Sequence, residues 1–130
     1  IAIAKKRARQ RASVGMLGKD LTRRSKGRCE LCGSKDDARP YELVPFPDEP
    51  TMERTLIACA RCRDWLEGGE IVAIEARFLE ETLWSTEPSV RLASARLIMR
   101  ADFADDPWVR DALEAVGYNP ATDEIEEPMH

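Results

Sequence analysis

Apolar residues recur along the chain in short blocks, and the spacing within each block predicts a secondary-structure element. Alternation over residues 41–44 (Y-E-L-V) predicts one short strand, and residues 55–58 (T-L-I-A) are expected to form a second. The three prolines between them predict a loop that cannot pair in a sheet. From residue 63 onward the spacing becomes helical, with helices expected over residues 63–67, 70–83, 88–101 and 108–116. The pattern therefore predicts a short β-hairpin followed by a mainly α-helical half.

The same spacing identifies side chains that we expect to be buried. In the helix over residues 70–83 the apolar residues fall on one stripe, made of Ile71, Ile74, Phe78 and Leu79. We interpret Trp84 and Trp108 as core anchors rather than as stacking platforms for a ligand. Gly117 follows the last helix at the position of a left-handed C-cap.

Charge is distributed unevenly along the sequence. Residues 1–28 contain ten basic residues and one acid, a net charge of +9, whereas residues 29–130 contain ten basic residues and 23 acids, a net charge of −13. The basic stretch favours helix, with Leu21 facing inward from a short helix over residues 19–25. Five of its residues are candidates for binding nucleic-acid phosphates: Lys5, Lys6, Arg7, Arg9 and Arg11. The alternatives are a solvated basic helix and an arm that folds back on its own acidic body.

All four cysteines of the chain lie around the predicted hairpin, in two C-x-x-C pairs. Cys29 and Cys32 form the first pair, and Cys59 and Cys62 form the second, with 26 residues between the pairs. A C-x-x-C turn aims two thiolates at one ion, and four sulfur ligands make the closed tetrahedral set of a structural Zn²⁺. We therefore predict one structural Zn²⁺ bound by these four residues.

Other uses of paired cysteines stay open at this point. Disulfides within each C-x-x-C pair would close very short loops and stabilise the fold little. A thioredoxin-like redox pair would explain one pair and leave the other without a role. Iron in a rubredoxin-like site would use the same four sulfur ligands as zinc.

Three arginines stand beside the predicted ligands: Arg28, Arg61 and Arg63. Four thiolates around Zn²⁺ leave a net charge of −2, which these cations can offset. A helix that opens at the second pair is typical of a treble clef, whereas a zinc ribbon has a second β-turn there. The predicted fold is thus a small α+β protein: a four-cysteine zinc treble-clef or zinc-ribbon module with a short β-hairpin, followed by a mainly α-helical C-terminal half.

The predicted organisation has four parts in chain order. A basic helical arm covers residues 1–27, and the zinc-binding module covers residues 28–67. A helical region over residues 70–118 is expected to pack on the zinc module, and residues 119–130 are expected to form a loose acidic tail. No apolar run approaches the roughly 20 residues of a membrane span, and no secretory signal is visible. We therefore expect a cytoplasmic protein with no membrane association and with reduced thiols.

Several motifs also point to a family. The stretch R-S-K-G-R-C-E-L-C-G-S is followed by Y-E-L-V-P-F-P, I-A-C-A-R-C-R, L-W-S-T-E-P-S-V and D-P-W-V-R-D-A-L-E. Together, over about residues 21–118, they resemble the N-terminal zinc-binding region of PhnA-like proteins, a family named after alkylphosphonate-utilisation operons. The resemblance implies a zinc-binding module, and the name implies a genetic neighbourhood rather than a reaction. Many family members continue into a C-terminal β-rich domain, and the basic arm is not part of the family's pattern.

These observations favour a zinc-stabilised binding module that contacts a macromolecule and catalyses no reaction. The basic arm favours nucleic acid as the partner, while the acidic helical body favours a protein or a second copy of the chain. The alternative is a metal-dependent hydrolase acting on a phosphonate or a nucleic-acid phosphodiester. Hydrolysis at zinc needs an open coordination position, which four cysteines close, and the one histidine is the remote His130. No small-molecule substrate is evident from the sequence.

Overall fold

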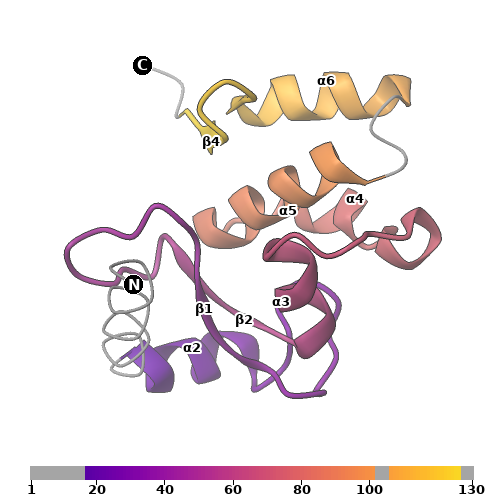
Figure 1. Cartoon of the computed structure of the whole chain (residues 1–130). Coiled ribbons are helices and arrows are strands. Elements are labelled where there is room, and N and C mark those ends of the chain that lie inside the picture. Colours follow the sequence, from indigo (N-terminus) through magenta and orange to yellow (C-terminus); the bar gives the residue numbers. More distant parts are fainter. Residues whose placement is uncertain (1–16, 102–105, 127–130) are drawn as a thin grey trace. The chain divides into compact units, whose positions relative to one another are not determined.

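The computed structural model describes residues 17–101 and 106–126 (Figure 1). The five basic residues proposed to bind nucleic acid lie outside this range. The chain divides into two compact units, residues 1–63 and residues 64–130, which are described separately below. Whether the helical region packs on the cysteine-containing unit, as the sequence predicts, therefore stays a prediction.

The first unit is built on an antiparallel two-stranded hairpin. Its described elements are α2 (Gly18–Ser25), β1 (Arg39–Glu42) and β2 (Thr55–Ala58), and α3 (Ala60–Leu66) begins in this unit and ends in the second. β1 pairs with β2 so that Arg39 lies opposite Ala58 and Glu42 lies opposite Thr55. All four residues of β2 are buried. The helix α2 contacts β2 (Figure 1), and its one fully buried side chain is Leu21, as predicted.

The hairpin confirms the predicted strand pair, but its first strand lies two residues earlier than predicted. The expected strand over residues 41–44 is replaced by one over residues 39–42, which includes Pro40. Proline lacks the N–H that a central strand needs, yet both strands of a two-stranded sheet are edge strands and tolerate it. Val44, beyond the end of the strand, is exposed.

The second unit is largely helical and ends in a small hairpin. It contains the 3₁₀ helix η2 (Ala73–Ala76), the helices α4 (Leu79–Thr82), α5 (Pro88–Arg100) and α6 (Pro107–Val116), and the strands β3 (Tyr118–Asn119) and β4 (Glu124–Ile125). α5 is buried over most of its surface and contacts α4, where the Ser94 hydroxyl lies 2.6 Å from the Thr82 hydroxyl. α6 ends at Gly117, whose φ of 83° confirms the predicted left-handed C-cap.

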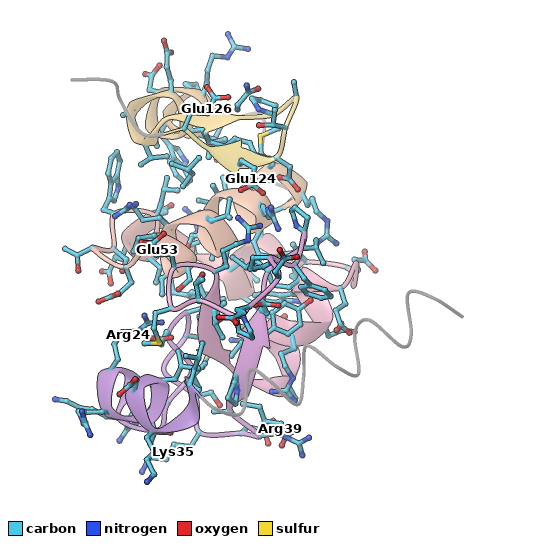
Figure 2. The ribbon with its side chains drawn as sticks, turned by 90° about the vertical axis from the view of Figure 1, so that its left-hand side faces the viewer. Arg24, Lys35, Arg39, Glu53, Glu124 and Glu126 are labelled. Atoms are coloured by element: carbon cyan, nitrogen blue, oxygen red, sulfur yellow. The ribbon has the colours of Figure 1, made fainter. Side chains whose placement is uncertain are left out.

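The acidic C-terminal segment is not the loose tail that the sequence predicts, at least as far as Glu126. β3 and β4 pair antiparallel, and the guanidinium of the buried Arg96 on α5 holds the turn between them. It donates to the Asp123 carbonyl at 2.9 Å and to the Glu124 carboxylate at 2.5 Å. Glu124 and Glu126 are labelled at this hairpin in Figure 2. The acids that suggested a solvated tail include the partners that neutralise a buried arginine.

The expected helix over residues 70–83 is interrupted, and one of its predicted core residues is exposed, as is the predicted core anchor that follows it. Val72 has an extended backbone before η2 begins, so the helical phase restarts after Ile71, and Ile74 is 80% exposed. Trp84, just after α4, is 55% exposed rather than a core anchor. The buried tryptophan of this unit is Trp65, which is 3% exposed and stacks on Phe78 with ring centroids 6.1 Å apart.

Within the described residues, no helix combines the length and the apolar character needed to cross a lipid bilayer.

One carboxylate in the first unit is buried without hydrogen bonds. Glu42, at the end of β1, is 6% exposed, and neither of its side-chain oxygens has a hydrogen-bond partner among the described residues. Burial raises the pKa of Glu42, and the positive charge of Arg54 opposes that shift only in part. The Arg54 guanidinium instead donates to the carbonyls of Leu43 and Val44. The ionised form of Glu42 therefore destabilises the folded state.

Glu42→Gln is expected to raise the free energy of unfolding by about 1 kcal/mol near neutral pH, because it removes a buried charge while preserving the shape. The gain should shrink as the pH falls towards the ordinary glutamate value of 4.5, where the unfolded chain also becomes protonated. Urea unfolding at several pH values measures this, with the exposed Glu53 (Figure 2) changed to Gln as the matched control. A destabilised Glu42→Gln variant would show that the carboxylate makes a stabilising contact.

Candidate metal centre

The four cysteine sulfurs converge at one point in the structure. The Sγ atoms of Cys29, Cys32, Cys59 and Cys62 all lie within 4.8 Å of one another. Cys29, Cys59 and Cys62 are 3%, 2% and 0% exposed, whereas Cys32 is only partly buried. No disulfide joins any of them. A compact set of four sulfur donors fits a tetrahedral metal ion of thiophilic character, such as Zn²⁺.

The first C-x-x-C pair sits on a tight turn held by backbone hydrogen bonds. The Cys29 N–H donates to the Ser34 carbonyl at 2.8 Å, and the Gly33 N–H donates back to the Cys29 carbonyl at 2.9 Å. The turn requires a left-handed backbone at Gly33, with φ of 82°, which favours glycine. Backbone N–H groups within this turn also point at the Cys29 sulfur, so the local chain conformation already prepares that sulfur to carry negative charge.

The second pair joins a strand to a helix. Cys59 directly follows β2, and Cys62 lies in the first turn of α3, where the Arg63 N–H donates to the Cys59 carbonyl at 2.9 Å. The Ala60 N–H donates to the Asp36 carbonyl at 3.2 Å, which ties the start of α3 to the segment after the first pair. The helical spacing therefore places both sulfurs of this pair on the same side of the chain, facing the first pair.

A buried carboxylate joins the two pairs. Glu30, inside the first C-x-x-C, donates its N–H to the Ile57 carbonyl at 2.8 Å and accepts the Ile57 N–H on its side chain, also at 2.8 Å. Arg24 projects from α2 towards the hairpin (Figure 2) and binds both Glu30 oxygens, at 2.6 Å and 2.9 Å. The same guanidinium donates to the Thr55 carbonyl at 3.0 Å. We call these contacts of Arg24 and Glu30 the Arg24–Glu30 clamp. It holds the first turn against Ile57 of β2, which lies two residues before Cys59.

Arg63 forms a second tie between the two segments. Its guanidinium donates to the Asp37 carboxylate at 2.7 Å, to the Ala58 carbonyl at 2.6 Å and to the Asp37 carbonyl. The hydrogen bond from Arg63 lowers the pKa of Asp37, which therefore stays ionised. These hydrogen bonds position the chain on either side of the centre, and the contribution of Arg63 to offsetting the charge of the sulfurs stays a prediction.

The other two predicted arginines lie at the surface. Partial burial lowers the pKa of Arg61, but a hydrogen bond to Cys32 and the charges of the neighbouring cysteines raise it by more. Arg61 is therefore in contact with one of the proposed ligands, and its contribution to charge balance at the centre stays a prediction. Arg28 is exposed, and its contribution to charge balance stays a prediction.

The surroundings of the cysteine sulfurs shift their pKa values in different directions. A hydrogen bond from the Cys62 thiol, helped by backbone N–H groups and opposed by burial, lowers the pKa of Cys29 to about 4. Donating that hydrogen bond raises the pKa of Cys62, and burial raises the pKa of Cys59. Cys59 and Cys62 must therefore release protons when they bind an ion, so metal affinity should fall in acid.

Sequence reasoning identified the four cysteines but not the clamp that positions them. Glu30 occupies a middle position of a C-x-x-C motif. The turn does not need a charged residue at that position, so the motif gives no reason to expect a role for Glu30. The available signal was a glutamate enclosed by Cys29, Leu31 and Cys32, with a basic helix immediately before it. Its partners, Arg24 and the backbone of β2, become neighbours only when the hairpin folds.

The fold and the centre define a small α+β protein with a four-cysteine cluster that could hold a metal ion. The sequence matches no model of a known protein family and has no match among curated proteins or solved structures. The resemblance to PhnA-like proteins therefore stays a prediction.

Glu30→Ala is expected to lower the free energy of unfolding by about 3 kcal/mol, because it removes the carboxylate that neutralises the partly buried Arg24 and that accepts the Ile57 N–H. Urea unfolding with zinc in excess measures the change. Asp20→Ala is the control, since Asp20 forms an exposed pair with Arg23 at 3.9 Å and should contribute about 0.5 kcal/mol or less. Equal effects of the two substitutions would contradict a special role for the Arg24–Glu30 clamp.

Proposed function

We propose that this chain is a zinc-stabilised binding module, in which one structural Zn²⁺ is held by Cys29, Cys32, Cys59 and Cys62. The observation that carries the proposal is the convergence of four sulfurs within 4.8 Å, from two turns that are far apart in sequence. Four sulfur ligands would complete tetrahedral coordination and leave no position for a reacting water. The proposed role of the ion is therefore to stabilise the fold rather than to catalyse a reaction.

Within this proposal we infer a treble-clef arrangement of the zinc module. The order of elements supports it: a C-x-x-C turn, the β1–β2 hairpin, and a second C-x-x-C whose Cys62 lies inside α3. A zinc ribbon would instead place the second pair on a β-turn. The same order, together with the C-E-L-C-G and W-S-T-E-P motifs, supports relationship to PhnA-like proteins.

Purified protein is expected to contain one zinc per chain, with Zn–S distances of about 2.3 Å. Elemental analysis and X-ray absorption test the two statements and also distinguish zinc from iron. Cys62→Ser should lose the metal and unfold the module, because metal binding and folding are coupled. Lys35→Ser, at an exposed position between the two pairs, is the matched control and should retain zinc. Protein without metal, or with a disulfide among the four cysteines, would refute the proposed zinc site.

The proposed partner is nucleic acid, bound through the phosphate backbone by the basic arm. The support is compositional: ten of the first 28 residues are basic, and the arm contains no aromatic residue that could stack on bases. Binding of this kind is sequence-independent and depends on the release of counterions. The competing role for the arm is to pack on the acidic body of its own chain or of a second copy.

For about five phosphate contacts, log K should fall with log salt with a slope of roughly −4 to −5. Replacing Lys5, Lys6, Arg7, Arg9 and Arg11 together by Gln should flatten that slope and leave the zinc content unchanged. Fluorescence anisotropy with single- and double-stranded oligonucleotides at several salt concentrations measures it, with Lys35→Gln as the control. An unchanged slope accompanied by a lower melting temperature or by dissociation of an oligomer would instead support the structural role of the arm.

A further inference from the structure

The four sulfurs differ in their access to solvent. Cys29, Cys59 and Cys62 are buried, while Cys32 is partly exposed at the end of the first turn. The next residue, Gly33, is exposed, and a side chain built there would meet no atom within 4 Å outside its two chain neighbours. Cys32 is therefore the most accessible of the four cysteines to a small reagent, and the residue after it has no side chain.

Cys32 also has the neighbours that a reactive sulfur needs. Arg61, which is exposed, hydrogen bonds to Cys32. The Cys32 Sγ lies 3.6 Å from the Cys59 Sγ, on the other C-x-x-C pair. The second hydrogen-bonded thiol pair, Cys29 with Cys62, likewise joins the two turns. A disulfide has an S–S length of about 2.0 Å, so only a small movement of the two sulfurs would be needed to form one between the two turns.

We propose that Cys32 is a peroxide-sensitive site, and that its oxidation leads to a Cys32–Cys59 disulfide and to release of the metal. Only the release of the metal rests on the proposed zinc site; the oxidation of Cys32 and the disulfide do not. The oxidant belongs to the class of peroxides, with hydrogen peroxide as the simplest member. The consequence is a centre that is stable in reducing conditions and opens under oxidation.

The reaction balances in two steps. The Cys32 thiolate attacks one peroxide oxygen, the O–O bond breaks, and a sulfenic acid forms with loss of one water after proton uptake. The Cys59 sulfur then attacks the Cys32 sulfur, the S–O bond breaks, and a second water leaves after a further proton is taken up. Two sulfurs together lose two electrons, and one peroxide gains them. With only Cys29 and Cys62 left as ligands, Zn²⁺ is released.

The experiment treats the zinc-loaded, full-length protein with limiting hydrogen peroxide. A chromogenic chelator follows zinc release, dimedone traps sulfenic acid, and peptide mass spectrometry locates each modification. Most of the trapped sulfenic acid is expected on Cys32, the final disulfide should join Cys32 to Cys59, and one zinc should be lost per peroxide consumed. The control is the same chain unfolded in guanidinium with chelator, where the preference for Cys32 should disappear.

Three results would overturn the inference: first modification at a buried cysteine, a disulfide within either C-x-x-C pair, or zinc retained after Cys32 is oxidised. These outcomes are separable from failure of the proposed function, because zinc content is measured before peroxide is added. If the protein contains no metal, the zinc proposal fails. The trapping on the reduced chain still decides whether Cys32 is the first sulfur to react and Cys59 its partner.

Discussion

The first unit depends on one requirement, that two turns separated by 26 residues present their sulfurs to the same point. The Arg24–Glu30 clamp helps to meet this requirement through protein contacts, because Glu30 holds the first turn to Ile57 through both its backbone and its side chain. A buried carboxylate must be neutralised, and this accounts for the position of α2, which delivers Arg24 to the hairpin. Local hydrogen bonds thus help to arrange the ligand set, and the proposed ion would stabilise the same arrangement.

The metal would matter because the hairpin unit has few other means of stabilisation. Its apolar core is formed mainly by Leu21, Leu31, Leu43 and the strand β2, which is small for a segment of this length. Two antiparallel strands alone are marginal in water. The hydrogen bonds of Glu30 and of Arg63 hold the two turns in position. They use charged side chains, however, and burying a charged side chain costs free energy. Coordination of four sulfurs would supply free energy that this core cannot, which is consistent with a structural rather than catalytic role.

The sequence predicted features that depend on a few neighbouring residues. It did not predict contacts between residues that are far apart in the chain. The hairpin, Leu21 and the C-cap at Gly117 follow from periodicity and from backbone preferences over a few residues. The exposure of Ile74 depends on an extended residue at Val72 that no propensity marks. Likewise Trp65 rather than Trp84 is buried because Phe78 comes to lie beside it. The C-terminal hairpin is held by the buried Arg96, which binds Asp123 and Glu124. The sequence pattern indicated only that these acids lie in a solvated tail.

The unequal exposure of the four sulfurs follows from the different ways in which the two C-x-x-C segments continue. After Cys32 the chain reverses at Gly33 so that the Gly33 N–H can reach the Cys29 carbonyl, and Cys32 is only partly buried. Cys62 lies within α3, and it is fully buried. One turn geometry therefore does two things. It encloses Cys29 within backbone N–H groups, and it leaves Cys32 partly exposed, where Arg61 hydrogen bonds to it.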